Sequence, residues 1–168
     1  GSSVYEPSRF VVVGGAGTAD QAYYSDDGAT WEVATLQGGP YTGNPSITFD
    51  GINFILVFDN SQSVLKSGDG ISWTEIPGAL PATGAKGIKY GKGKVVLMGG
   101  TAADTAYYST DGASTWSTAT VGSSTVNFDT VAYGKNRFIA RAVASTGEAY
   151  SFDGETWISN NYASGNWG

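Results

Sequence analysis

The strongest constraint on this chain is one turn sequence that occurs four times at a constant spacing. Each copy begins with a serine, places an aspartate directly before a glycine, and ends with a tryptophan. The copies are residues 25–31, 67–73, 109–116 and 151–157, and successive serines are 42 residues apart each time. A fixed period of this length indicates a repeat architecture, so the 168 residues divide into four similar units.

Each unit carries a second signal ahead of this turn. An aromatic residue, a short polar turn and an apolar run recur at 5–10, 49–54, 90–95 and 133–138. This pattern predicts a β-hairpin, because Gly and Asn at the turn centre tolerate a positive φ and the flanking residues favour strands. In the last unit the four predicted strands are 128–133, 138–143, 148–151 and 157–160. No stretch keeps an unbroken 3.6-residue apolar period, so no helix is predicted.

Four short strands in about 40–45 residues are typical of one blade of a propeller. We therefore predict an all-β chain that forms a β-propeller of four four-stranded antiparallel blades. A single domain is expected over residues 1–168, with repeats at about 1–43, 44–84, 85–127 and 128–168. The last repeat stops near the phase at which the first begins, so a ring closed within one chain is expected, and closure removes exposed sheet edges. The alternative is a larger propeller that two chains form together.

The chemistry of the repeated turn explains its residues. The aspartates can accept backbone N–H bonds across the turn, and the glycines supply the backbone freedom that it needs. The tryptophans are predicted to open the fourth strand and to pack between blades. These residues are Asp27, Asp69, Asp111 and Asp153, Gly28, Gly70, Gly112 and Gly154, and Trp31, Trp73, Trp116 and Trp157.

The four turn segments resemble the Asp-box repeats of sialidase-like β-propellers, and the resemblance covers the whole chain. In that family the box is a structural turn between the third and fourth strands of a blade. Asp and Gly are adjacent in all four copies here, which is similar to the compact boxes of phage tail-fibre and other virion-associated propellers. The resemblance implies the fold and no particular activity.

Composition excludes several classes of function. Cysteine and histidine are absent, which removes disulfides, thiolate metal sites and the commonest general base. The net charge is −6 with nine Lys and Arg, so no basic stripe for nucleic acid is expected. No apolar run approaches the roughly 18 residues of a membrane span, so no membrane insertion is expected. No acidic residue closes the repeated turns as a calcium loop would require, and we expect neither a metal nor a cofactor.

An enzymatic reading has little support in the charged residues. A sialidase-like site needs a cluster of arginines, and the chain has only Arg9, Arg137 and Arg141. Arg9 and Arg137 occupy the same position in two different repeats, so they cannot easily converge. The acids outside the repeated turns are scattered, which argues against the paired carboxylates of an ordinary glycosidase. We therefore predict no catalytic residues and no enzymatic activity.

Binding is the remaining hypothesis for the function. In a propeller the loops that leave the second and fourth strands lie on one face, where a ligand is expected. The candidate ligand-binding residues in and beside these loops are Tyr41, Tyr162, Asp20, Asp59, Asp104, Arg141 and Glu148. The tyrosines could stack on a sugar or a protein surface, or simply pack over a loop. Arg141 replaces the apolar residues Val13, Val57 and Met98 of the other repeats. It either reaches the rim or faces a ligand, with Glu148 and Asp104 as its expected partners.

We therefore expect a non-catalytic structural or binding module. The favoured interpretation is a propeller displayed on a virion or cell surface, as an adhesin, a phage-fibre module or a capsid decoration. Its partner would be a glycan or a protein surface, other virion proteins included, and its location extracellular or on the virion surface. The alternative is a soluble carbohydrate-binding lectin, and a third reading is a sialidase-like glycoside hydrolase.

Overall fold

A computed structural model of the chain describes residues 9–14, 22–41, 43–99, 105–121, 127–142 and 147–161. Every regular element in these ranges is a β-strand. Within the same ranges, no helix is long and apolar enough to cross a membrane. The prediction of an all-β chain is confirmed.

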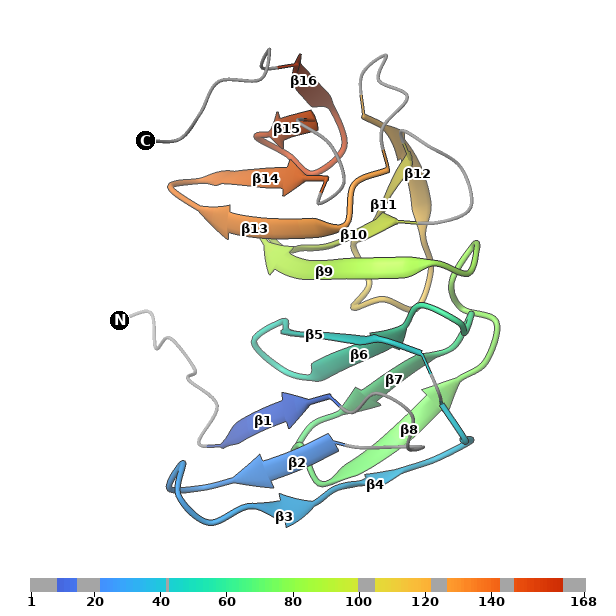
Figure 1. Cartoon of the computed structure of the whole chain (residues 1–168), viewed down its shortest axis with the longest axis vertical. Coiled ribbons are helices and arrows are strands. Elements are labelled where there is room, and N and C mark those ends of the chain that lie inside the picture. Colours follow the sequence, from blue (N-terminus) through green and yellow to red (C-terminus); the bar gives the residue numbers. More distant parts are fainter. Residues whose placement is uncertain are drawn as a thin grey trace.

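The strands form four successive sheets, one for each repeat (Figure 1). The strands are β1 (Phe10–Val13), β2 (Ala22–Ser25), β3 (Glu32–Val33), β4 (Thr35–Leu36), β5 (Pro45–Phe49), β6 (Phe54–Phe58), β7 (Val64–Ser67), β8 (Ser72–Ile76), β9 (Ala85–Gly91), β10 (Lys94–Gly99), β11 (Thr105–Ser109), β12 (Ser117–Thr120), β13 (Thr130–Gly134), β14 (Arg137–Arg141), β15 (Gly147–Ser151) and β16 (Trp157–Asn161). Each repeat runs back and forth as an antiparallel sheet, so the strand order within a sheet follows the chain.

The four strands predicted for the last repeat are observed as β13 to β16, with boundaries within about two residues at the described ends. The first sheet has three described strands, β1 to β3, because its predicted innermost strand would fall in residues 1–8, outside the described residues. The second sheet has a fifth strand that the sequence did not predict. This is β4, which pairs in parallel with β8 and so ties the first repeat to the edge of the second.

The repeated turns adopt the predicted hydrogen bonding. In the first of them, Asp27 Oδ1 accepts the N–H groups of Ala29 at 2.8 Å and Thr30 at 2.7 Å. The Ser25 hydroxyl donates to the same carboxylate at 2.9 Å and accepts the N–H of Gly28 at 2.8 Å. Gly28 has a φ of 74°, and Gly70 and Gly154 have φ angles of 75° and 80°, a conformation that favours glycine. In the third turn, which is one residue longer, Ala113 takes this place with a φ of 66°, and its N–H donates to Ser109 Oγ at 2.8 Å.

Neighbouring sheets pack through three apolar clusters. Each cluster joins the second strand of one sheet to the second strand of the next. The clusters include Val11 and Leu56 at the first contact, Ile55 and Leu97 at the second, and Val96 and Phe138 at the third. The second and third sheets therefore act as blades that bury one face against the blade before and the other face against the blade after.

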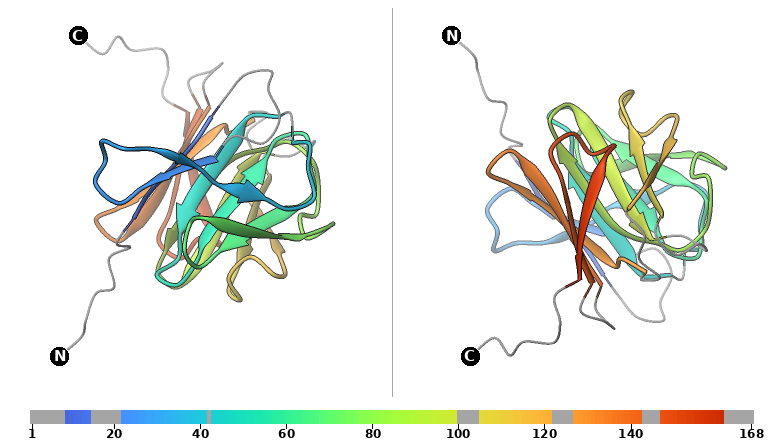
Figure 2. Two further views of the ribbon diagram at one scale, coloured as in Figure 1. Left: turned by 90° about the horizontal axis from the view of Figure 1, so that it is seen from below. Right: turned by 90° about the horizontal axis from the view of Figure 1, so that it is seen from above.

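The four blades form an open arc. The first and fourth blades lie at opposite ends of the long axis (Figure 1). Viewed along that axis, these two overlap on one side, and the second and third blades lie on the other (Figure 2). The described residues therefore do not form the closed four-bladed ring that was expected, because closure depends on the rotation between adjacent blades, and repeat length does not determine that rotation.

The open ends leave two apolar faces exposed. The leading face is the side of the first blade that points away from the second blade, and it is formed by Phe10, Val12 and Val33. The trailing face is the side of the fourth blade that points away from the third blade, and it is formed by Ile139, Ile158 and Arg141. Phe10 is 58% exposed and Ile139 is 47% exposed. In β6 of the second blade every residue is buried, whereas β14 alternates between exposed and buried residues.

The prediction that the four repeat tryptophans occupy equivalent inter-blade positions is wrong. Trp73 and Trp157 are buried, and their indole Nε1 atoms donate to the carbonyls of Gly70 and Gly154 at 3.2 and 3.3 Å. Trp31 is 40% exposed because none of the other three described blades covers this side of the first blade. Trp116 is half-buried, and its turn contains one additional residue.

Candidate functional site

The predicted binding residues that the structure describes lie at one end of the blades. At this loop end, the second strand of each blade leads to the third and the fourth leads to the next blade. Asp20, Asp104 and Tyr162 lie outside the described residues. The other four, Tyr41, Asp59, Arg141 and Glu148, lie at this end as expected, but in different environments.

Tyr41 is not the exposed aromatic that was predicted. Its side chain is only 6% exposed, and its ring stacks on Phe58 with 4.8 Å between centroids and 9° between planes. Its hydroxyl donates to the carbonyl of Gln37 at 2.9 Å. Tyr41 thus packs over its own loop, the alternative that the sequence had left open, and its ring face is not available for stacking on a ligand.

Asp59 holds two connections together. Its carboxylate accepts the backbone N–H of Asn44 at 2.8 Å and the side-chain amide of Asn44 at 2.7 Å. Its backbone carbonyl accepts the N–H of Gly84 at 2.6 Å. Both oxygens of the carboxylate therefore organise the entry to β5, which explains this acid structurally.

Arg141 and Glu148 are direct neighbours, as the sequence predicted. They are cross-strand partners at the loop end of β14 and β15. Arg141 is exposed and Glu148 is half-buried. Because directly paired residues project from the same face of an antiparallel sheet, both side chains belong to the trailing face, at its loop end.

The structure adds two charged residues beside this pair. Lys86, at the start of β9, forms an ion pair with Asp129, which lies just before β13 and therefore in the next blade. The backbone N–H of Asp129 donates to the carbonyl of Arg141 at 3.0 Å. We call Lys86, Asp129, Arg141 and Glu148 the loop-end cluster. The sequence could not identify Lys86, because its partner is 43 residues away in another blade.

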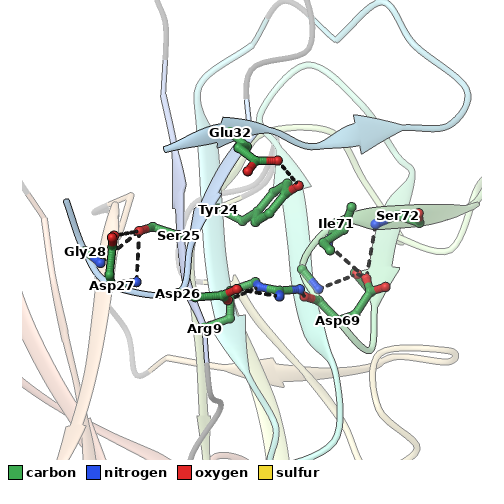
Figure 3. A network of polar contacts seen from close by, with 12 residues as sticks. Arg9, Tyr24, Ser25, Asp26, Asp27, Gly28, Glu32, Asp69, Ile71 and Ser72 are labelled. Atoms are coloured by element: carbon green, nitrogen blue, oxygen red, sulfur yellow. Dashed lines mark hydrogen bonds and ion pairs between the residues drawn. The ribbon is translucent and has the colours of Figure 1, made fainter. Parts of the chain in front are cut away.

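Arg9 occupies the opposite, turn end of the molecule (Figure 3). Its guanidinium donates to both oxygens of Asp26, at 2.6 and 3.1 Å, and to the backbone carbonyl of Asp69 at 2.8 Å. The hydrogen bond with Asp26 raises the pKa of Arg9 and lowers the pKa of the Asp26 carboxyl. Beside it, the Tyr24 hydroxyl donates to Glu32 at 2.6 Å, which raises the pKa of Tyr24.

The contact from Arg9 to the next blade is repeated further along the chain. Lys94 holds the equivalent position in the third blade, and its ammonium donates to the carbonyl of Asp153 in the fourth blade at 3.0 Å. Lys94 also forms a 2.9 Å ion pair with Glu155. The cation at the start of the second strand therefore ties its blade to the next one.

The repeat turns hold their carboxylates in the ionised form. The pKa is lowered at all four aspartates, Asp27, Asp69, Asp111 and Asp153. For Asp27 the N–H groups of Thr30 and Ala29 are the main cause, and they lower its pKa to about 2. At Asp111 burial is the largest single influence and raises the pKa, but the hydrogen bonds from Thr115, Ser109 and Ser114 together outweigh it. Carboxylates that accept several hydrogen bonds in this way stabilise a turn and are poor proton donors near neutral pH.

The described acids do not gather into a metal site. Within the described part of the chain, no group of three or more Asp or Glu side chains could hold a metal ion. The three arginines also lie apart: Arg9 contacts Asp26, Arg137 lies over Phe152 with 5.2 Å to the ring centroid, and Arg141 faces the loop end. The loop-end cluster offers charges of both signs for binding.

The sheets, their order and their packing define the class of protein: the chain consists of β-propeller blades. No protein-family model and no curated protein sequence match it. Solved β-propeller structures do match. They include YCF48 bound to a D1 peptide (22% identity, TM-score 0.62), YCF48 from Cyanidioschyzon merolae (17%, 0.60) and virginiamycin B lyase from Staphylococcus aureus (11%, 0.68).

These similarities extend over most of this chain and about half of each of the other proteins. The matches cover 89%, 89% and 84% of this chain, and 49%, 52% and 48% of the two YCF48 chains and the lyase, respectively. The chain therefore spans about half the length of the propellers it matches. At such low identity the similarity establishes the fold alone, and the matched proteins include both a lyase and a peptide-bound protein.

Proposed function

We propose that this chain is a non-catalytic β-propeller module that binds a peptide or protein surface through its loop-end cluster. The Asp-box character of its repeat turns is part of the proposal. It rests on the recurring Ser, Asp and Gly contacts and on the resemblance drawn from the sequence. In this interpretation the turns build the blades, and the opposite, loop end does the binding.

One observation carries the proposal. At the loop end of the second and third strands, three blades place an apolar pair: Val13 with Ala22, Val57 with Val64, and Met98 with Ala106. The fourth blade places Arg141 opposite Glu148 at the same register. Packing of the repeat does not require charged residues there, and opposite charges at facing positions beside the Lys86–Asp129 ion pair suit recognition of a polar surface.

The comparisons give limited additional support. One structure of similar fold is YCF48 bound to a D1 peptide, so the propeller scaffold is compatible with peptide binding. A protein partner is also favoured over a glycan because Tyr41, one of the two aromatics proposed to stack on a sugar, is buried. Display on a virion or cell surface, with other virion proteins as partners, remains a prediction from composition and from the resemblance.

The proposal is tested with a peptide library and a glycan array, each probed with the 168-residue chain. We expect selected peptides to carry both acidic and basic residues, complementary to Arg141 and Glu148. Arg141→Ala should then weaken binding of a selected peptide at least about tenfold, because it removes one partner of a charged contact. Stability should change by less than about 0.5 kcal/mol, since the side chain is exposed.

The control is Lys135→Asn, which removes a cation from the turn between β13 and β14, at the other end of the same blade. Asn is chosen because Lys135 has a φ of 47°, which asparagine tolerates. This variant should bind the selected peptide like the unmodified chain. Binding that is unaffected by Arg141→Ala, or binding of glycans without any peptide, would contradict the proposal.

A further inference from the structure

We propose that two copies of this chain complete one propeller, with the trailing face of each copy packed on the leading face of the other. The proposal goes beyond the proposed function; it places Arg141 and Glu148 of the loop-end cluster at the rim of the new contact, and it is tested by mass and not by peptide binding. It assigns a partner of defined chemistry, a second copy, to the two apolar faces that the open arc leaves uncovered.

The two faces are the two halves of a contact that already occurs three times within the chain. In the internal contacts, the side chains on one side of a second strand meet those on the opposite side of the next second strand. Ile55 and Val57, for example, share a cluster with Val95 and Leu97, and all four side chains are buried. At the ends of the arc the same positions are Ile139 and Arg141 on the trailing face, and Phe10 and Val12 on the leading face. The trailing face thus corresponds to the face that an internal blade turns toward the following blade, and the leading face to the face that it turns toward the preceding blade.

The glycines of the repeat turns show the same unfilled place. A Cβ added at Gly70 would lie 2.6 Å from Val11 Cγ2 of the preceding blade, and one added at Gly154 would lie 2.8 Å from Val96 Cγ2. At Gly28, in the first blade, an added Cβ would meet only the ring of Phe10, in its own blade, at 3.6 Å. The residue of the fourth blade that corresponds to Val11 and Val96 is Ile139, which is exposed.

The contacts that a cation at the start of the second strand makes with the next blade also lack a partner at the open end. Arg9 and Lys94 each donate to the carbonyl of the turn aspartate in the following blade, at 2.8 and 3.0 Å. Arg137 holds the same position in the fourth blade, which is the last of the described blades. Its guanidinium lies over the rings of Phe152 and Tyr150, at 5.2 and 6.0 Å from their centroids. In the proposed assembly Arg137 donates to the carbonyl of Asp27 of the second copy.

The curvature of the arc fits an assembly of two. The chain superposes on 48–52% of three complete chains of β-propeller proteins with TM-scores of at least 0.60. Adjacent blades are therefore related as in a ring of about twice this size, and four blades turn through about half of it. A head-to-tail contact closes into a ring when the rotation allows, and here the same contact made twice closes a two-fold ring.

Arg141 and Glu148 are the charged exception on the trailing face. They lie opposite each other at its loop end, so charges of opposite sign face each other at the rim of the contact, where water remains accessible. The middle of the face is apolar: Ile139, Tyr150 and Ile158 form one row across three strands. The contact therefore has an apolar centre and a charged rim.

The test is the mass of the 168-residue chain in solution, measured by sedimentation velocity over a range of concentrations. We expect a species of twice 17.4 kDa. Phe10→Glu and Ile139→Glu should each weaken association at least about tenfold, because each places an unpaired charge in an apolar contact. Both residues are exposed in the single chain, so circular dichroism and the thermal midpoint of the monomer should be retained.

The matched control is Ile52→Glu, since Ile52 is also an exposed aliphatic residue, at 74%, but lies in the turn between β5 and β6 on neither face. Its mass should equal that of the unmodified chain. A chain that is monomeric at all concentrations, or a trimer or filament, would overturn the proposal. A dimer that responds to only one of the two substitutions would also overturn it, because it would be built from a single face.

Discussion

The contact between the third and fourth blades can be tested by adding one methyl group to it. Gly154 lies in the repeat turn of the fourth blade with a φ of 80°. A Cβ at this position would lie 2.8 Å from Val96 Cγ2 of the third blade and 3.3 Å from the ring of Phe138. Gly154→Ala therefore combines an unfavourable backbone conformation with a clash between blades.

The two costs can be estimated separately. An L-residue in the left-handed region costs about 1–2 kcal/mol relative to glycine. Forcing an additional methyl group into a packed core costs about 1–3 kcal/mol, because side chains leave their preferred rotamers. Val96 is fully buried, so it has little room to move away. We expect Gly154→Ala to lower the free energy of unfolding by about 2–5 kcal/mol.

Gly112→Ala is the matched control for the backbone cost. Gly112 lies in the repeat turn of the third blade with a φ of 69°, one residue before Ala113, whose N–H makes the serine contact that Gly154 makes in the fourth blade. A Cβ added at Gly112 would meet only the ends of long or flexible side chains, Asp50 Oδ2 at 3.3 Å and Lys66 Nζ at 3.7 Å. This variant should lose only the backbone cost of about 1–2 kcal/mol. The difference between the two variants then measures the clash between the blades.

The assay is urea denaturation, followed by tryptophan fluorescence and circular dichroism. Val96→Ala removes the methyl group that the Cβ of Ala at position 154 would strike. The double variant should therefore be more stable, by about 1–3 kcal/mol, than the sum of the two single effects predicts. Equal losses for Gly154→Ala and Gly112→Ala, or no coupling between Gly154→Ala and Val96→Ala, would refute the packing of blade on blade described above.

Two further predictions follow from the turns and the loops. The carboxyls of the repeat turns have lowered pKa values, so they contribute stability that is present above their unfolded pKa of 3.8 and is lost as the pH falls toward about 2, the folded value for Asp27. The urea midpoint should therefore fall steeply between about pH 4 and about pH 2. It should fall less steeply in Asp27→Asn, because the amide does not titrate. Equal slopes of urea midpoint against pH in the two proteins would contradict this prediction. Tyr41→Ala should lower the free energy of unfolding by about 3–5 kcal/mol, because its ring is buried against Phe58. Tyr41→Phe removes only the hydrogen bond to Gln37 and should cost about 1 kcal/mol. If Tyr41→Ala also lowered the free energy of unfolding by less than about 1 kcal/mol, the loop would not pack as described.

The sequence predicted the elements of this protein well because their causes are local. Each repeat turn is held by contacts among residues at most four positions apart, such as those from Asp27 to Ala29 and Thr30. The hairpins depend on residues at the turn centre, and Lys135 and Asn136 indeed adopt positive φ angles of 47° and 60°. A period of 42 residues then predicted four similar sheets.

The candidate site was predicted only in part, for the opposite reason. Arg141 could be singled out because it breaks the repeat pattern, and its pairing with Glu148 follows from the hairpin between β14 and β15. Lys86 and Asp129 were missed, since no local pattern indicates a contact across 43 residues. Tyr41 was misjudged because the sequence does not show that its loop folds back over Phe58.

The sequence by itself determined what each repeat is: a four-strand antiparallel unit closed by a Ser, Asp and Gly turn, with a tryptophan at the start of its last strand. Only the tertiary structure decided what surrounds each copy. Trp31 and Trp157 have the same place in the repeat, yet one is 40% and the other 5% exposed. The physical reason is that burial of a blade face depends on whether another blade covers it. That depends on the number of blades and the angle between them, which side-chain packing determines and the repeat length does not.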